Sequence, residues 1–136
     1  MKNEEQERIE SGWDVKRTLT KINYKIHTDA IKKHLIPENI SQQQVNIVYA
    51  NEADVLNVAL FGKTAKEWRD ANPKKDGNIR DYTDVTQLVV LANLEGMNAE
   101  FIRQGLTQPD RLVKLNQIAI VQMRSLLDNN SVKKLK

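Results

Sequence analysis

A run of apolar residues at helical spacing near the start of the chain constrains the fold more than any other feature. These residues follow one another at steps of four, three, four and four, which keeps them on one face of an α-helix. They are Val15, Leu19, Ile22, Ile26 and Ala30. The pattern predicts an amphipathic helix over residues 13–36 that places this face in the core. Pro37 ends the segment,.

The next two helices are marked by their ends. Ser41 with Gln44, and Thr64 with Glu67, each form the pattern of a capping box, in which two side chains satisfy the first amide groups of a helix,. Gly62 is a typical C-terminal cap,. The sequence therefore predicts one helix between Ser41 and Gly62 and a short second helix that begins after Thr64.

Two further helices are predicted in the second half of the chain. One begins near Thr83 and ends at Gly105, and Gly96 inside it indicates a kink or a close helix crossing,. Its predicted buried residues are Val85, Leu88, Val89, Ala92 and Ile102. The last helix follows Thr107. Its predicted buried residues are Leu112, Leu115, Ala119, Met123 and Leu126.

These elements predict an all-α fold, a single compact domain of five or six helices. With only five Gly and three Pro, the chain has too little turn chemistry for an all-β fold,. We expect the helical domain to span 13–128, preceded by a frayed acidic segment (1–12) and followed by a basic tail (129–136). The first and last helices should supply much of the core.

The composition also indicates where the protein works. No apolar run reaches the roughly 18 residues of a membrane span, and no signal peptide opens the chain,. The chain has no cysteine, which fits a reducing compartment,. We therefore expect a cytoplasmic protein without membrane contact.

The two histidines do not form a metal site. His27 and His34 are seven residues apart, so a continuous helix separates them by about 10.5 Å along its axis,. Metal ligands sit within roughly 2 Å of zinc, so the pair cannot chelate one ion. A helix break at Thr28 or Asp29 would change this geometry, but no third ligand is near. We predict no metal and no cofactor, and His34 fits the negative end of a helix.

No motif supports an enzyme. The chain lacks a Gly-rich phosphate loop, a nucleophile elbow and an HExxH motif,. Two acidic pairs, Glu52 with Asp54 and Asp81 with Asp84, could serve acid–base chemistry only if a cleft joined them. Because both pairs lie where helix N-termini are expected, capping is the simpler interpretation.

Two basic clusters are candidates for nucleic-acid binding. The first contains Lys16, Arg17, Lys21 and Lys25 and continues to Lys32 and Lys33, while the second contains Lys63, Lys66, Arg69, Lys74, Lys75 and Arg80,. The second cluster resembles a helix–turn–helix outline, although it is short and includes acidic residues. The alternative is a helical hairpin whose Trp68 packs into the core.

The loop "NPKKDGNIRDY" is a candidate site for a small anionic ligand such as a nucleotide. Its predicted binding residues are Arg80, Asn78, Lys74 and Lys75. Arg80 offers a rigid fork of donors, and Gly77 allows a turn with positive φ. Ile79 would fix the loop to the helices. The alternative is structural, with Arg80 paired to Asp81, Asp84 or Glu52.

Several stretches resemble a known family. They are "INYKIHTDAIKKHLIP", "YANEADVLNVALFGKTAKEWRDANP", "GNIRDYTDVTQLVVLANLEGMNAEFI" and "QPDRLVKLNQIAIVQM". Together they resemble the region that follows the KilA-N domain in bacterial and prophage proteins, without the KilA-N module itself. The resemblance implies a phage context and transfers no catalytic residue. We therefore expect a non-enzymatic interaction domain, accessory to a DNA-binding or phage–host regulatory protein, which self-associates or binds an unidentified protein partner. The alternatives are binding of DNA and binding of a nucleotide.

Overall fold

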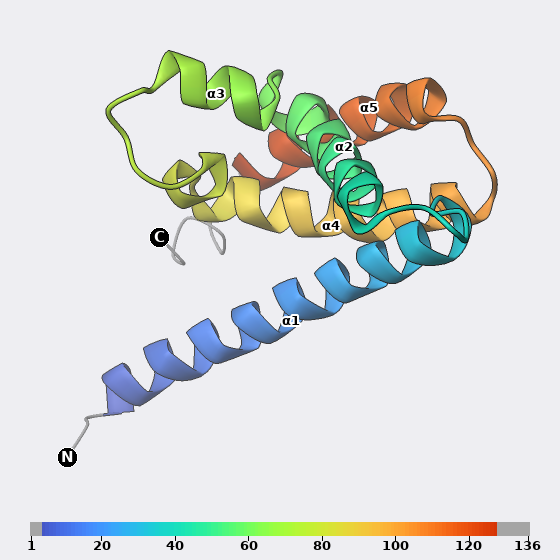
Figure 1. Ribbon diagram of the computed structural model, residues 1–136. Helices are drawn as coiled ribbons and strands as arrows, with labels where there is room; N and C mark the ends of the chain where they lie inside the picture. Colours follow the sequence, from blue (N-terminus) through green and yellow to red (C-terminus); the bar gives the residue numbers. More distant parts are fainter. Residues whose placement is uncertain (1–3, 128–136) are drawn as a thin grey trace.

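The computed structural model describes residues 4–127, apart from the side chains of residues 4–17 and Leu19. Over these residues the chain forms five α-helices and one short 3₁₀ helix and contains no strand (Figure 1). The predicted all-α fold is confirmed. The predicted basic tail, 129–136, lies outside the described residues.

From α2 onward the helix boundaries lie within a few residues of the expected ones, whereas α1 begins nine residues earlier than expected. The helices are α1 (Glu4–His34), α2 (Gln42–Phe61), α3 (Ala65–Ala71), the 3₁₀ helix η1 (Ile79–Tyr82), α4 (Val85–Arg103) and α5 (Gln108–Leu127). Because α1 is continuous through His27, the break considered at Thr28 or Asp29 does not occur. Residues 4–12 belong to the same helix as residues 13–34.

Local capping explains where the helices start. The capping boxes at Ser41 and Thr64 are both formed, and Gly62 ends α2 with a φ of 76°, as predicted. Two more boxes begin at Asn78, before η1, and at Asp84, before α4. Side-chain oxygens therefore satisfy the first amide groups of four successive helical elements.

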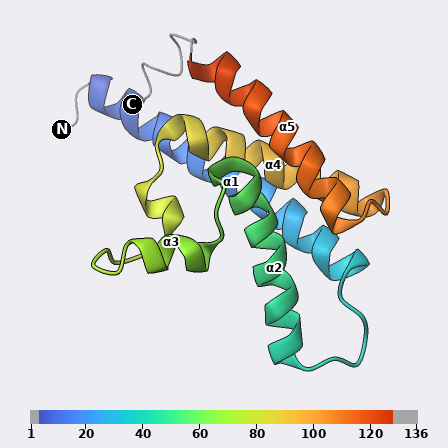
Figure 2. The ribbon, with the colours of Figure 1, turned by 90° about the horizontal axis from the view of Figure 1, so that it is seen from above.

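α4 is the central helix of the molecule. α1 packs along one side of α4, while α5 packs against both α4 and α2 (Figures 1 and 2). α2 crosses the other long helices at a steep angle in Figure 2, and α3 and η1 lie together to one side of it. Because α4 touches α1, α2 and α5, its buried residues point to several sides, including Val90, Leu91, Leu94 and Ala99.

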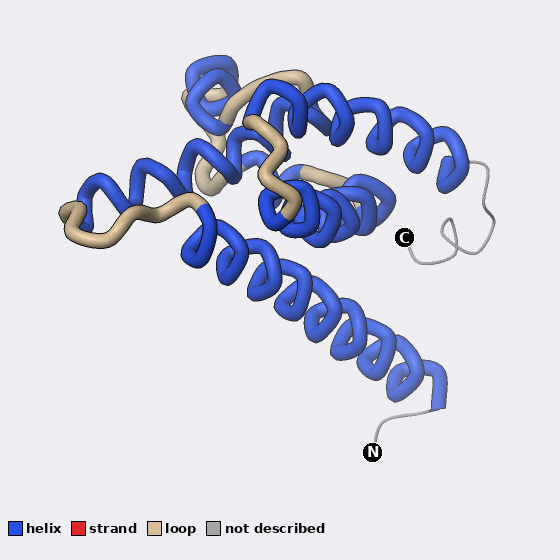
Figure 3. The backbone as a smooth tube through the Cα atoms, turned by 90° about the vertical axis from the view of Figure 1, so that its right-hand side faces the viewer, coloured by secondary structure: helices blue, strands red, loops and turns tan. Residues whose placement is uncertain are grey.

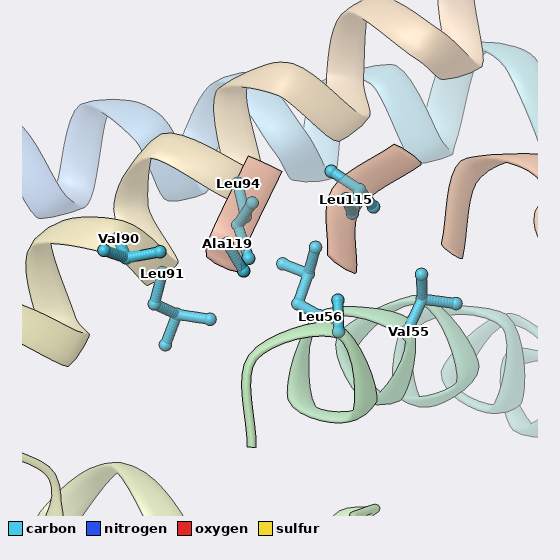
Figure 4. Packing of buried hydrophobic residues seen from close by; sticks show 8 residues of the cluster. Val55, Leu56, Val90, Leu91, Leu94, Leu115 and Ala119 are labelled. Carbon is cyan, nitrogen blue, oxygen red and sulfur yellow. The ribbon is translucent and has the colours of Figure 1, made fainter. Parts of the chain in front are cut away.

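The hydrophobic core lies between α2, α4 and α5 (Figure 4). α2 contributes Val55, Leu56 and Ala59 to this cluster, and α5 contributes Leu115 and Ala119. As expected, the last helix supplies part of the core. Among the described side chains of α1, Ile31 is the one buried hydrophobic residue, while the expected core residues Val15 and Leu19 lie outside the described side chains.

The two described isoleucines of the predicted apolar face of α1 do not point into the core. Ile22 and Ile26, predicted to be buried, are 49% and 48% exposed. The buried positions are His27 and Ile31, which lie about 140° around the helix from the two isoleucines at 100° per residue,. Half of α1 also extends beyond the rest of the molecule, as Figures 1 and 3 show.

Candidate functional site

Polar side chains from four helices meet inside the molecule. His27 comes from α1, Glu52 from α2, Asn98 from α4 and Arg111 from α5, and none of the four is more than 4% exposed. Buried polar groups are stable only when they are hydrogen-bonded, so the pairing of each atom decides what the cluster can do.

Glu52 and Arg111 form the charged part of this polar network. Both carboxylate oxygens of Glu52 accept hydrogen bonds from the two terminal nitrogens of Arg111, in a forked ion pair,. Gln108 donates a further bond of 2.9 Å to Glu52. Burial raises the pKa of Glu52, but the bonds from Arg111, Gln108 and Asn98 outweigh it, and the pKa lies below its ordinary 4.5. Glu52 is therefore ionised at neutral pH.

Asn98 connects this ion pair to His27. Its carbonyl oxygen accepts a 3.0 Å bond from Arg111, and its amide nitrogen donates to Glu52 over 3.2 Å. The same amide nitrogen lies 2.8 Å from Nε2 of His27. Because the amide nitrogen can only donate, Nε2 of His27 must accept and carries no proton. Burial of the ring, together with Arg111, lowers the pKa of His27 to about 4.

The hydrogen bonds of the polar network connect the four helices. Arg111 also bonds to nearby backbone, because its Nε donates to the carbonyl oxygen of Leu106 over 3.2 Å. The described residues hold no group of three His, Asp or Glu side chains suited to a metal ion. His34 is exposed in the last turn of α1 and does not approach His27.

The capping interpretation of the two acidic pairs is half correct. Asp84 caps α4 and Asp81 belongs to the capping box of η1, as predicted. Glu52 and Asp54 instead lie in the middle of α2, so a capping role at the start of a helix is wrong for them. Asp54 accepts a 2.9 Å bond from the backbone nitrogen of Ala65, the first residue of α3.

Asn78 and Arg80, two of the residues predicted to bind an anion, have partners within the chain. The Asn78 side chain accepts a 2.9 Å bond from the backbone nitrogen of Arg80. Arg80 donates a 2.8 Å bond to Glu95, a residue outside the set of partners considered from sequence. Among the described residues the second oxygen of Glu95 has no partner. Burial raises the pKa of Glu95, although Arg80 opposes the shift. Ile79 is buried and fixes the loop to the helices, as expected.

An aromatic contact closes the same loop. The rings of Trp68 and Tyr82 stand 5.3 Å apart, and the ammonium group of Lys75 lies 5.0 Å above the Tyr82 ring,. The Tyr82 hydroxyl donates to the backbone of Asp76 over 2.7 Å. Lys74 is exposed beside this contact. The loop is thus braced from within by its aromatic and polar residues.

The basic clusters are spread over different surfaces. Lys21 and Lys25 are exposed on α1, where Lys25 pairs with Asp29 at 3.2 Å. The side chains of Lys16 and Arg17 lie outside the described set. Lys66 and Arg69 are exposed on α3, and Lys63 is half-buried before it.

The helical-hairpin alternative fits α3 better than a helix–turn–helix. α3 has only seven residues, and its Trp68 is buried. Glu67 and Asp70 are exposed on the same short helix, where they would repel phosphate,. Nucleic-acid binding through the basic residues stays a prediction.

The remaining candidate is the exposed apolar face of α1. We define the α1 stripe as Val15, Leu19, Ile22 and Ile26, which repeat at steps of four, three and four. This is the spacing of the contact positions in a coiled coil. The two stripe residues whose side chains are described, Ile22 and Ile26, are half exposed. A helix face of this kind suits contact with another helix.

Comparisons with known proteins add no family. No family model matches the chain, and neither does any curated protein or solved structure. None of the helices in the described part of the chain combines the length and apolar character needed to cross a bilayer.

Proposed function

We propose that this chain is a non-enzymatic interaction domain that self-associates through the α1 stripe. The observation that carries the proposal is the half exposure of Ile22 and Ile26 on a helix whose other side is buried. Isolated apolar residues are common on surfaces, but a stripe with coiled-coil spacing is a specific signal for helix pairing. A second copy presents the same stripe, so the partner needs no further assumption.

The other surfaces favour the same function. The residues of the polar network hydrogen-bond to one another, and contacts with Glu95 and Tyr82 hold the loop around Arg80 closed. Neither feature leaves a group poised for catalysis. The resemblance to the region after KilA-N domains supports an accessory role in a phage or prophage regulatory protein.

Self-association is tested by removing the stripe. In sedimentation equilibrium the wild-type chain should form a concentration-dependent dimer. The double substitution Ile22→Ser and Ile26→Ser removes four half-exposed side chains per dimer, worth about 1 kcal/mol each. The dissociation constant should therefore rise about a thousand-fold.

The matched control is Ile47→Ser. Ile47 is 53% exposed on α2, away from the stripe. This variant should dimerise like the wild type, and all variants should keep the same helical circular dichroism. A wild-type chain that stays monomeric at high concentration, or an equal loss in the Ile47→Ser control, would contradict the proposal.

A further inference from the structure

α1 carries opposite charges in its two halves. Residues 4–14 contain five acidic residues and one basic residue, while residues 15–34 contain six basic residues and one acidic residue. The acidic residues of the first half are Glu4, Glu5, Glu7, Glu10 and Asp14. The basic residues of the second half are Lys16, Arg17, Lys21, Lys25, Lys32 and Lys33. A helix with this polarity complements a second copy of itself only when the two run in opposite directions.

The α1 stripe has a register that fits this direction. Its four positions are symmetrical about a point between residues 20 and 21. In an antiparallel pair centred there, Val15 of one copy lies opposite Ile26 of the other, and Leu19 lies opposite Ile22. All four layers then match apolar with apolar, and residues 4–14 lie beside residues 27–37 of the second copy.

The shape of the molecule leaves room for the same arrangement. α1 is about 46 Å long and α4 about 28 Å long at 1.5 Å per residue,. Only the second half of α1 is covered by the other helices, and the first half extends away from them (Figures 1 and 3). In an antiparallel pair, helices α2 to α5 of each copy stand next to the extended half of the other copy's α1. A parallel pair would instead crowd these helices of both copies at one end.

From these three observations we infer that the partner of α1 is a second copy in antiparallel orientation, with the register that places residue 20 opposite residue 21. This inference rests on the proposed function and adds its geometry. The polar network supports it by holding His27 inward, because that fixes which side of α1 remains outward. The acidic first half of α1 is then a docking segment for the basic second half of the other copy.

Distances between spin labels distinguish the two directions. The chain has no cysteine, so one introduced cysteine carries one label per copy. Lys21 and Lys32 are both exposed and lie on the same side of α1, off the stripe. Across an antiparallel pair, labels at Lys32→Cys should lie about 35 Å apart, since residue 32 then stands opposite residue 9. Labels at Lys21→Cys should lie within about 20 Å, because the helix axes are about 10 Å apart.

The possible outcomes test the antiparallel direction and the proposed self-association separately. A long distance at residue 32 with a short one at residue 21 supports the inference. Short distances at both positions mean a parallel pair, which overturns the inference but leaves self-association standing. Long distances at both positions place the contact away from α1, which overturns the inference and the stripe together. A monomer in the labelling samples overturns the proposed function itself.

Discussion

Asn98 favours the neutral form of His27. An amide group has one acceptor and one donor end, and Arg111 and Glu52 together fix which end points where,. The donor end that remains faces His27, so a protonated ring would place two donors against each other. Burial of the ring is the largest cause of its lowered pKa of about 4. Protonation of His27 should therefore weaken the contact between α1 and α4.

The first prediction concerns stability against pH. The pKa of His27 is about 4 in the folded protein and 6.5 ordinarily, so the unfolded chain takes up a proton first as the pH falls. The stability that neutral His27 contributes is present at neutral pH and is lost as the pH falls from about 6.5 to about 4. It should amount to about 2 kcal/mol between pH 7 and pH 5. Urea unfolding at both pH values measures it.

His27→Gln is the control for that measurement. Glutamine has an oxygen that can accept from Asn98 and does not titrate. Between pH 7 and pH 5, the free energy of unfolding of the variant should fall by about 2 kcal/mol less than that of the wild type. Parallel profiles for the two proteins would show that His27 is not the titrating group.

At the scale of elements, a half-buried charge pair joins the segment between α3 and α4 to α4. Arg80 of η1 bridges to Glu95 of α4, whose side chain is 1% exposed. Gly77 sits in the turn before it with a φ of 89°, and an added Cβ would meet a carboxylate oxygen of Asp81 at 2.3 Å. A side chain at position 77 would therefore disturb this turn, and Arg80 joins the loop to α4.

The next prediction concerns the ion pair between Arg80 and Glu95. Arg80→Ala leaves the Glu95 carboxylate buried without its cation, which should cost about 2 kcal/mol at pH 8. Because burial already raises the pKa of Glu95, the carboxyl group can bind a proton at lower pH. The cost should therefore be smaller at pH 5 than at pH 8. Thermal unfolding at both pH values measures the difference.

Two further variants test whether loss of the ion pair causes the loss of stability in Arg80→Ala. Arg69→Ala makes the same change at an exposed position of α3 and should be nearly neutral,. Glu95→Gln added to Arg80→Ala should remove the pH dependence of the loss. If Arg80→Ala behaves like Arg69→Ala at both pH values, the pair does not hold the loop.

The elements that sequence predicts well are those whose signals are local. The capping boxes at Ser41 and Thr64 and the cap at Gly62 depend on residues a few positions apart, and all three are formed. The apolar face of α5 is likewise correct, because α5 has one buried side. Periodicity gives the angle of a stripe around a helix. It does not say whether the core or a partner lies on that side, and α1 differs from α5 in this respect.

The polar network could not be predicted for a different reason. Glu52, Asn98 and Arg111 stand 46, 13 and 59 residues from one another and come from three helices. Each looks in sequence like a residue of a solvated helix face. Only the packing of α2, α4 and α5 brings them together. His27 was singled out, but its partner Asn98 lies 71 residues away.

At the scale of the whole molecule, the described side chains of α1 face two different surroundings. His27 and Ile31 are buried on one side of its second half, while Ile22 and Ile26 on another side remain half exposed. Because most helical stability in proteins comes from packing of one face, the extended half of α1 would gain stability from the proposed second copy. In the proposed dimer, folding and association would use different sides of the same helix.

The last prediction is the response of the dimer to salt. In an antiparallel pair the acidic half of each α1 lies along the basic half of the other. Salt shortens the range of such attractions from about 10 Å at 0.1 M to about 3 Å at 1 M. The dissociation constant should therefore rise roughly tenfold across that range. A parallel pair would place like charges together, so salt would tighten it. Glu7→Gln with Glu10→Gln removes two of the acidic charges and should flatten the salt dependence, and sedimentation equilibrium in sodium chloride measures both proteins.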